Sequence, residues 1–572
     1  MATAIASSRP RTRATATSPR RPAALRRRTR MGATCSCLSG PICIPELPER
    51  AFSPGDQTPL AAPGSGLYTL LIMSKRATIA VAVALVTALA SSAPRAATYH
   101  VTPEGEDAAP GSEMRPWRTL QHAADVAQSG DTVFVGPGEY DGFNLENKAG
   151  TPEHPLVFLA APGARVIRPG PRPAHAPLNT ALGSYSWPKW PHGIYVWGSS
   201  HVSIEGFEIV GMPAAEHDAA GALLHRGGAG IHVQVSDHIT LRHNRADDNG
   251  RWGIFASFTD DLVVEDNECS RSRAEHGIYA SNSADRPIVR RNLLWGNRRA
   301  GIQLNGDNNF DSADYRARAG VVDGIISGAV LEDNLLVDNG AGGAAAINLD
   351  GVQDALIQRN VLVGNHGSGV ALFQVDGAEG SRRNCVLDNL ILMAHDARYA
   401  IQIASCAPPG SSTCPSANLP ALPEWQRPPS RATGSTGNVL LHNTLLHPNP
   451  ERGSLRIDAR SLDTSAGFRS DLNLVSGRFA LGATDEMEND RVLSLVEWRA
   501  LTGQDRRSCR IDAPRPPASP AQGSGAGPGG SRNPQRRAIA GAIRRTWSHA
   551  PEGLGAESPP PDTRASRRDR GR

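Results

Sequence analysis

Trp252-Gly-Ile-Phe-Ala-Ser257 and His276-Gly-Ile-Tyr-Ala-Ser281 are two copies of one short phrase, placed 24 residues apart. Apolar residues alternate with other residues inside the phrase, which is typical of a β-strand. Further copies, some of them looser, begin at His192, Ala229, Ala300, Ala345, Ser368 and Tyr399. We therefore expect one short strand per copy. The side chains expected to point inward are Ile194, Ile231, Ile254, Ile278 and Ile302, and the residue after each should point outward.

A second phrase follows each first one and consists of a short apolar run that ends in Asn, as in Leu262-Val-Val-Glu-Asp-Asn267. Asn tolerates the left-handed conformation of a tight turn, and stacked Asn side chains can form a ladder. A third strand often follows and is closed by another Asn, as in Leu293-Leu-Trp-Gly-Asn297. Three such strands cannot bury a core alone, so successive coils must stack on one another.

These phrases resemble the repeats of right-handed parallel β-helix proteins in the pectate-lyase-like superfamily, over about residues 98–505. The resemblance implies an all-β fold, a single-stranded right-handed parallel β-helix or solenoid with a short N-terminal capping helix. Trp117–Ala127 has the amphipathic pattern of that helix. The superfamily includes lyases, hydrolases, epimerases, tailspikes and accessory proteins, so the resemblance does not fix the function.

The two ends of the chain differ from its middle. Residues 73–97 have the form of a secretory signal peptide, with a basic start at Lys75-Arg76, an apolar run and small residues after it. We therefore expect secretion or export to the periplasm, and we interpret 1–72 as a disordered upstream extension; a transit-like leader is the rival interpretation. Residues 511–572 are rich in Pro, Gly and Arg, and we expect a disordered tail.

The net charge of +4 belongs to these ends, because residues 77–510 carry 37 basic and 48 acidic residues. An acidic middle argues against nucleic-acid binding, which needs a basic face. We expect no membrane insertion, since the apolar run of the signal segment is short. The expected partner is an acidic polysaccharide, bound by a monomer.

Outward residues of successive first phrases should form two stripes on one face. Aromatic rings beside amides and hydroxyls suit sugar rings, which stack on one face and form hydrogen bonds at their edges. Lys189 precedes the first clear coil and could lie on the rim. The predicted substrate-binding residues are Tyr195, Trp197, Phe255, Gln303, Asn305, Asp350 and Lys189. The alternative is that loops cover these rings or that they pack on each other.

The densest polar phrase surrounds His276. A lyase that acts on a uronic acid must neutralise a carboxylate, remove the C5 proton and protonate the leaving oxygen, and His, Tyr and Arg suit these roles. The predicted catalytic residues are His276, Tyr279, His232 and Arg251. The opposing interpretation is structural, because His192 holds the same repeat position as His276.

Residues 306–328 interrupt the repeat and contain several acids. Oxygen clusters of this kind can hold Ca²⁺, so Asp307 and Asp311 are candidate metal ligands, although solvated loop acids are the plainer interpretation. The Lys-based pattern of pectate lyases is not matched, since only Lys148 and Lys189 follow residue 97. Three hypotheses remain open: a polysaccharide lyase or C5-epimerase, a non-catalytic carbohydrate-binding β-helix, and a glycoside hydrolase that uses Asp307 and Asp350.

Overall fold

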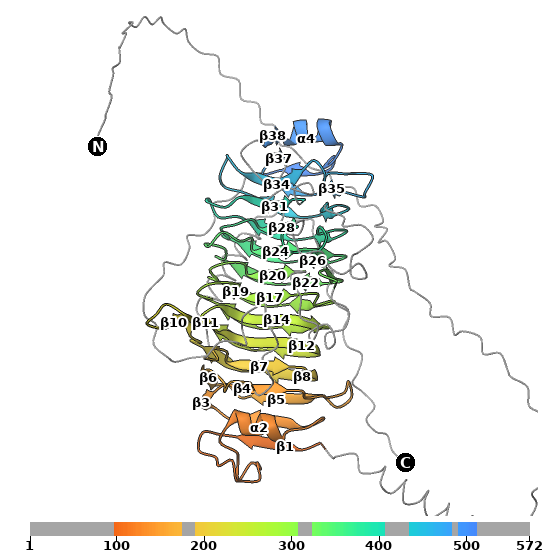
Figure 1. Cartoon of the computed structure of the whole chain (residues 1–572). Coiled ribbons are helices and arrows are strands. Elements are labelled where there is room, and N and C mark those ends of the chain that lie inside the picture. The colour runs from red at the N-terminus through yellow and green to blue at the C-terminus, as the bar shows by residue number, and fades with distance from the viewer. Residues whose placement is uncertain (1–95, 174–188, 307–322, 406–433, 483–489, 512–572) are drawn as a thin grey trace, which may run out of the picture. The chain divides into compact units, whose positions relative to one another are not determined.

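A computed structural model describes residues 96–173, 189–306, 323–405, 434–482 and 490–511 (Figure 1). The predicted extension 1–72, nearly all of the signal segment 73–97 and the tail from residue 512 lie outside these ranges. The described part is built from short strands that stack in parallel, coil upon coil.

The strands form three stacks. The first contains β4 (Phe143–Glu146), β7 (Ile194–Trp197), the start of β12 (Ala229–Arg242), β14 (Trp252–Asp260), β17 (Ile278–Ser281), β20 (Ile302–Asn305), β24 (Ile347–Asp350), β28 (Val370–Phe373), β31 (Tyr399–Ile403), β34 (Gly453–Asp458) and β37 (Arg478–Gly482). The second contains β1 (Thr98–Val101), β2 (Thr132–Val135), β5 (Leu156–Ala160), β8 (Ser200–Glu205), the end of β12, β15 (Val263–Glu265), β18 (Ile288–Arg290), β22 (Val330–Glu332), β26 (Leu356–Gln358), β29 (Cys385–Leu387), β32 (Val439–Leu441) and β35 (Arg469–Asp471). The third contains β3 (Gly138–Asp141), β6 (Ala164–Arg168), β9 (Glu208–Val210), β13 (Arg245–Asp247), β16 (Glu268–Ser270), β19 (Leu293–Trp295), β23 (Leu335–Val337), β27 (Val361–Val363), β30 (Leu390–Leu392), β33 (Thr444–Leu446), β36 (Leu474–Val475) and β39 (Cys509–Arg510).

The register of the first stack is the one that the repeated phrase predicts. Ile231 pairs with both Ile194 and Ile254, and Ile278 pairs with both Ile254 and Ile302. All five Ile side chains are fully buried in one continuous core, as predicted. The parallel β-helix is therefore confirmed.

The glycine of the phrase is required by the distance between coils. A Cβ atom on Gly253 would lie 2.6 Å from the carbonyl oxygen of Gly277, and one on Gly277 would lie 2.8 Å from that of Gly301. Both distances are shorter than non-bonded atoms allow. A bulky residue at this position would thus push the coils apart.

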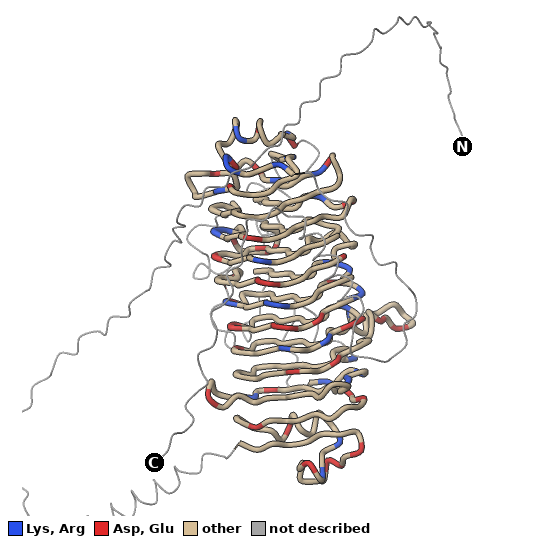
Figure 2. The backbone as a smooth tube through the Cα atoms, turned by 180° about the vertical axis from the view of Figure 1, so that it is seen from behind, with Lys and Arg blue, Asp and Glu red and all other residues tan. Residues whose placement is uncertain are grey.

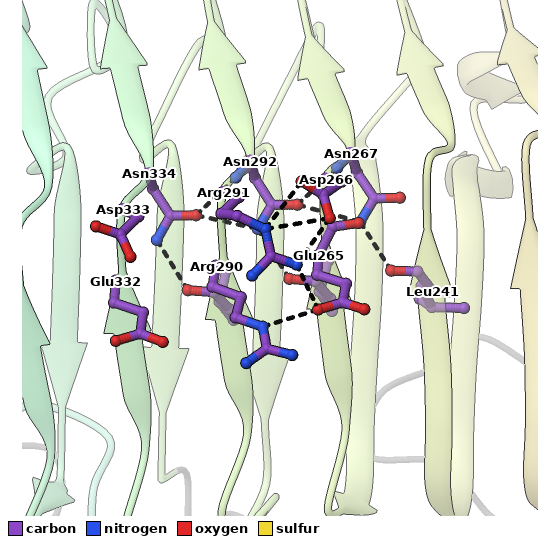
Figure 3. A network of polar contacts seen from close by, with 12 residues as sticks. Leu241, Glu265, Asp266, Asn267, Arg290, Arg291, Asn292, Glu332, Asp333 and Asn334 are labelled. Atoms are coloured by element: carbon purple, nitrogen blue, oxygen red, sulfur yellow. Dashed lines mark hydrogen bonds and ion pairs between the residues drawn. The ribbon is translucent and has the colours of Figure 1, made fainter. Parts of the chain in front are cut away.

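The predicted asparagine ladder is present in the turn between the second and third stacks (Figure 3). Asn267 Oδ1 accepts the backbone N–H of Asn244, and Asn292 Oδ1 accepts that of Asn267, each at 2.9 Å. A parallel ladder joins Asn297, Asn339 and Asn365 in the next turn. The expectation that the Asn itself is left-handed is wrong. The residue before it adopts positive φ, as Asp266 (56°) and Arg291 (55°) do, which frees the Asn side chain to turn inward.

Charges alternate from coil to coil along this turn. Arg290 Nε donates to Glu265 Oε2 at 2.7 Å, and Arg291 donates to both Glu265 and Asp266 (Figure 3). Both signs are interspersed over the coils in the view from behind (Figure 2). Stacked like charges would repel, so this alternation favours the native register.

Both ends of the stack are capped. The predicted N-terminal helix is α2 (Leu120–Val126), which packs against β4 and begins at Thr119, whose side chain accepts the N–H of His122. At the other end β38 (Arg491–Ser494) pairs antiparallel with β37, and α4 (Leu495–Thr502) places Trp498 on Phe479. These caps cover open strand edges. Within the described ranges, no helix has the length and apolarity to span a membrane.

Candidate functional site

The outer face of the first stack holds a pocket of about 260 Å³. Its lining includes four predicted residues of the strands, Tyr279, Gln303, Asn305 and Asp350. Arg251 and His276, which were also predicted, line it beside the N-terminal ends of the strands. The pocket thus joins residues from five coils that the sequence separates by more than a hundred positions.

A row of rings in contact leads into the pocket. Tyr195, His232, Phe255 and Tyr279 occupy paired positions on successive coils, and their ring centroids lie 5.2, 4.7 and 5.0 Å apart in that order. Tyr279 is the half-buried last ring and lines the pocket. The row continues as amides, since Asn348 Nδ2 donates to Gln303 Oε1 at 2.6 Å.

Several predicted binding and catalytic residues do not line the pocket. Tyr195 and Trp197 are 0% and 1% exposed, and Trp190 packs on the Tyr195 ring at 4.9 Å. Phe255 is buried beneath Trp252, whose ring stacks on it at 4.5 Å. The outward face is therefore covered here, and these rings pack on each other instead of meeting solvent.

Two further predicted residues, His232 and Lys189, lie away from the pocket. His232 is 1% exposed and lies between the rings of His192, at 4.6 Å, and Phe255. Lys189 is at the surface, where its Nζ donates to Glu216 Oε1 at 2.6 Å on the hairpin of β10 (Ala214–His217) and β11 (Leu223–Gly227). Neither residue lines the pocket.

His276 accepts a hydrogen bond from the backbone of the next coil. Its Nδ1 accepts the N–H of Ala300 at 3.1 Å, and burial, with the nearby Arg299 and Arg251, lowers its pKa to about 3. The neutral ring therefore carries its proton on Nε2, which lies 3.4 Å from Glu275. His192 accepts the N–H of Ala229 in the same way at 3.0 Å. In this arrangement His276 can donate a hydrogen bond but has no lone pair left for a general base.

Three charged residues form one edge of the pocket. Glu275 lies 3.6 Å from Arg251 and 3.3 Å from Arg299. The Arg251 guanidinium also stands 4.0 Å over the Trp252 ring, and burial lowers its pKa from the usual value of a guanidinium. This edge therefore presents two guanidinium groups, and that of Arg251 stacks on the ring of Trp252.

Two carboxyl groups lie at the opposite edge. Asp350 accepts the backbone N–H groups of Val375 and Asp376 at 2.8 Å and that of Gly377 at 3.1 Å. Burial raises the pKa of Asp350 to about 7, against the lowering effect of these donors. Asp376 is half-buried, and its Oδ2 accepts Asn305 Nδ2 at 3.2 Å. One carboxyl group is thus buried with a raised pKa, and the other is partly accessible.

The predicted calcium ligands Asp307 and Asp311 lie outside the described residues. Asp350 accepts three backbone N–H groups with its two oxygens, which leaves at most one lone pair for a cation.

The pocket includes residues that were not among the predicted site residues. They are Trp252, Glu275, Arg299, Ala344, Asn348, Phe373, Val375 and Asp376. Glu275 and Arg299 lie directly before a copy of the repeated phrase, as the predicted Arg251 does, and the three follow one another at intervals of 24 residues. Extending the phrase backward by one position would have found Glu275 and Arg299. Asp376 lies in a turn with no repeat of its own.

Two family models match the chain. Residues 192–389 match the model described as right handed beta helix region, and residues 103–148 match a protein family of unknown function. The uncharacterized protein YwoF of Bacillus subtilis (strain 168) is 25% identical over 223 residues. That alignment covers 38% of this chain and 45% of YwoF, so the chain spans less than half of YwoF's length.

Solved structures align with part of this chain at low sequence identity. The alginate lyase from Paenibacillus sp. str. FPU-7 aligns with a TM-score of 0.39 and 16% identity, over 60% of this chain and 95% of that one. A glycoside hydrolase aligns with a TM-score of 0.42 and 12% identity, over 68% and 94%. The strand stacks and the family match together identify this chain as a right-handed parallel β-helix protein.

Proposed function

We propose that this chain is an exported enzyme that acts on a uronic-acid polysaccharide, as a lyase or a C5-epimerase, at the pocket beside Tyr279. The observation that carries the proposal is the composition of that pocket. A half-buried tyrosine stands between a cationic edge, with Arg251 and Arg299, and a group of amides, with Asn305 among them. Such a set can bind a sugar carboxylate and move a proton.

The three tasks of the reaction divide among these residues. The amides of Gln303 and Asn305 and the guanidinium of Arg251 would bind the carboxylate, which lowers the cost of forming a carbanion at C5. Tyr279 would transfer the proton through its hydroxyl, since it lines the same pocket as Arg251. In an elimination the C5–H bond breaks, a C4–C5 double bond forms, and the C4–O bond breaks as its oxygen takes a proton. In an epimerisation Tyr279 keeps the proton that it takes from C5, and water on the opposite face of the ring gives C5 another.

His276 has a supporting part in this proposal. Because its Nδ1 is engaged by Ala300, we assign it the role of a hydrogen-bond donor through Nε2 and not that of the base. His232 is buried away from the pocket, so the proposal gives it no part in the chemistry.

Glycoside hydrolysis is the second candidate, and Asp350 and Asp376 favour it. A hydrolase needs one protonated and one ionised carboxyl group, and the raised pKa of Asp350 beside the accessible Asp376 fits that division. The pair replaces the predicted combination of Asp307 with Asp350.

One experiment separates these candidates. The purified protein is incubated with alginate, pectate and glycosaminoglycans in D₂O, and unsaturated ends, new reducing ends and deuterium at C5 are measured. Unsaturated ends indicate a lyase, deuterium without cleavage indicates an epimerase, and reducing ends without unsaturation indicate a hydrolase. The absence of all three on every polymer would leave the non-catalytic alternative and refute the proposal.

The variant Tyr279→Phe tests the residue assignment. We expect the turnover number to fall by about 10²–10⁴-fold, the usual contribution of a general acid or base, while the ring still stacks on Phe255. Tyr195→Phe is the matched control, since that hydroxyl is buried in the same row three coils away and should leave turnover unchanged. Equal turnover of Tyr279→Phe and the wild type would remove Tyr279 from the mechanism.

A further inference from the structure

A second cluster of polar side chains lies in the turn between the first and second stacks, away from the pocket. It consists of His201, Asp237 and His238. Asp237 pairs with Ser200 in the register of the two coils, so His201 and His238 occupy the same position one coil apart. Their rings stack with centroids 4.4 Å apart and planes inclined by 30°.

The backbone has the same conformation at both histidines. His201 and His238 have φ angles of 50° and 51°, the left-handed conformation that recurs at the turns of this solenoid. Such a conformation is uncommon for a residue other than Gly, Asn or Asp. Two consecutive coils therefore present an imidazole at the same place on the surface.

The donor atoms of the three residues lie within 4.8 Å of one another. Asp237 Oδ1 is 2.8 Å from His238 Nδ1, and the two side chains are 51% and 49% exposed. Tetrahedral zinc sites have ligand atoms roughly 3.4 Å apart, as follows from Zn–N distances of about 2.0–2.1 Å. Half-exposed side chains can reach that spacing by small rotations.

Asp261 is the next residue in this column and has another partner. Its carboxylate lies 3.8 Å from His238 Nε2, but both of its oxygens accept hydrogen bonds from Arg286 at 2.8 Å. The charge of Asp261 is thus largely balanced by Arg286. Two imidazoles and the Asp237 carboxylate remain as the ligand set.

We propose that His201, His238 and Asp237 bind a divalent transition-metal ion such as Zn²⁺. Two imidazole nitrogens and one carboxylate oxygen suit Zn²⁺, Cu²⁺ and Ni²⁺, whereas Ca²⁺ requires more oxygen ligands. One ligand comes from the coil of β8 and two from the coil of β12. The bound ion would tie two coils together at the surface, and its fourth position would hold water. The site is independent of the proposed enzymatic function.

Zinc titration of the full-length protein by calorimetry tests this proposal. We expect one Zn²⁺ per chain at this site and at least about tenfold weaker binding in His201→Gln and in His238→Gln, since even indirect partners of a metal ligand contribute that much. His217→Gln is the control, because His217 is exposed on the hairpin at another place and should leave the affinity unchanged.

A second measurement does not depend on the variants folding alike. Cu²⁺ bound to the wild type should give an electron paramagnetic resonance spectrum with coupling to two imidazole nitrogens, and each variant should lose one of them. Zn²⁺ should also raise the melting temperature of the wild type and not that of either variant. Failure of the wild type to bind zinc, or unchanged binding in both variants, would overturn the proposal.

Discussion

Asn267 is bonded to Leu241 of the preceding coil: its side-chain Nδ2 donates to the Leu241 carbonyl oxygen at 2.8 Å. Its Oδ1 accepts the N–H of Asn244, so one buried amide serves both a donor and an acceptor of the neighbouring coil. Each Asn in the ladder repeats this pattern, and the turns of adjacent coils are joined by side chains where the strands are interrupted. The ladder is therefore part of the hydrogen bonding of the fold.

Replacing Asn267 with Ala should destabilise the protein strongly. The substitution leaves the Leu241 carbonyl and the Asn244 N–H buried without these partners, and each such group costs about 1–3 kcal/mol, so a loss of roughly 2–6 kcal/mol is expected. The midpoint of urea unfolding measures it. Asp266→Asn is the control, because this half-buried neighbour loses only its ion pair with Arg291 and should cost less than about 1 kcal/mol. Similar midpoints for the two variants would contradict the role of the ladder.

The fold was predictable because its determinants are local and repeated. The phrase around Ile254 fixes which side chains enter the core, and Gly253 recurs because the coils approach each other closely there. The conformation of the turn was assigned to the wrong residue, since sequence alone does not say whether Asn267 or Asp266 takes the left-handed position. Both residue types tolerate it, and only the inward hydrogen bonds of Asn267 decide.

Charge reversal at Arg291 should weaken the stack in a salt-dependent way. Arg291 lies in the column between the acidic pair Glu265 and Asp266 and the acidic pair Glu332 and Asp333 (Figure 3). The variant Arg291→Glu places a fifth carboxylate among these four, which should lower the unfolding midpoint at low salt and recover partly at high salt.

The neutral variant Arg291→Gln controls for the lost ion pairs. Because Arg291 is 44% exposed, we expect Arg291→Gln to cost about 1 kcal/mol or less and to depend little on salt. If both variants responded to salt equally, repulsion within the column would not explain the effect.

The site was only partly predictable, because segments outside the repeat cover part of the outer face of the first stack. Periodicity places Tyr195 and Tyr279 in one outward row, which the register confirms. It does not say that Trp190 packs on Tyr195 while Tyr279 stays accessible, because that packing comes from a segment outside the repeat. Asp376 was missed for the same reason, since a non-repeating turn brings it to Asn305.

Asp350 should make the free energy of unfolding fall as the pH rises, which is opposite to the usual effect of a carboxyl group. Its pKa is raised to about 7 in the fold, above roughly 3.9 in the unfolded chain, so the folded state binds the proton more tightly. The stabilisation that comes from the protonated carboxyl is therefore complete below about pH 4 and is lost as the pH rises through 7.

The variant Asp350→Asn isolates this effect. Urea midpoints of the wild type and the variant are compared at a series of pH values between 4 and 8, and the wild type should lose stability relative to the variant as the pH rises. The difference between the proteins removes the contribution of the other titrating groups. Parallel curves would show that Asp350 titrates at the same pH in the folded and unfolded states.

His276 and His192 provide a test that separates structure from chemistry. Both accept a backbone N–H of the next coil through Nδ1, from Ala300 and Ala229, and both are buried. Replacing either with Phe removes that acceptor. His192→Phe and His276→Phe should therefore lower the free energy of unfolding by similar amounts, about 1–3 kcal/mol for each unpaired donor, as measured from the urea midpoints.

Only His276 lines the pocket, so His276→Phe should also reduce turnover, and His192→Phe should not. Because the proposal makes His276 a donor and not the base, the pH profile of the remaining activity should keep the limbs of the wild type. A profile that loses one limb in His276→Phe would instead identify His276 as the proton-transferring group and displace Tyr279 from that role.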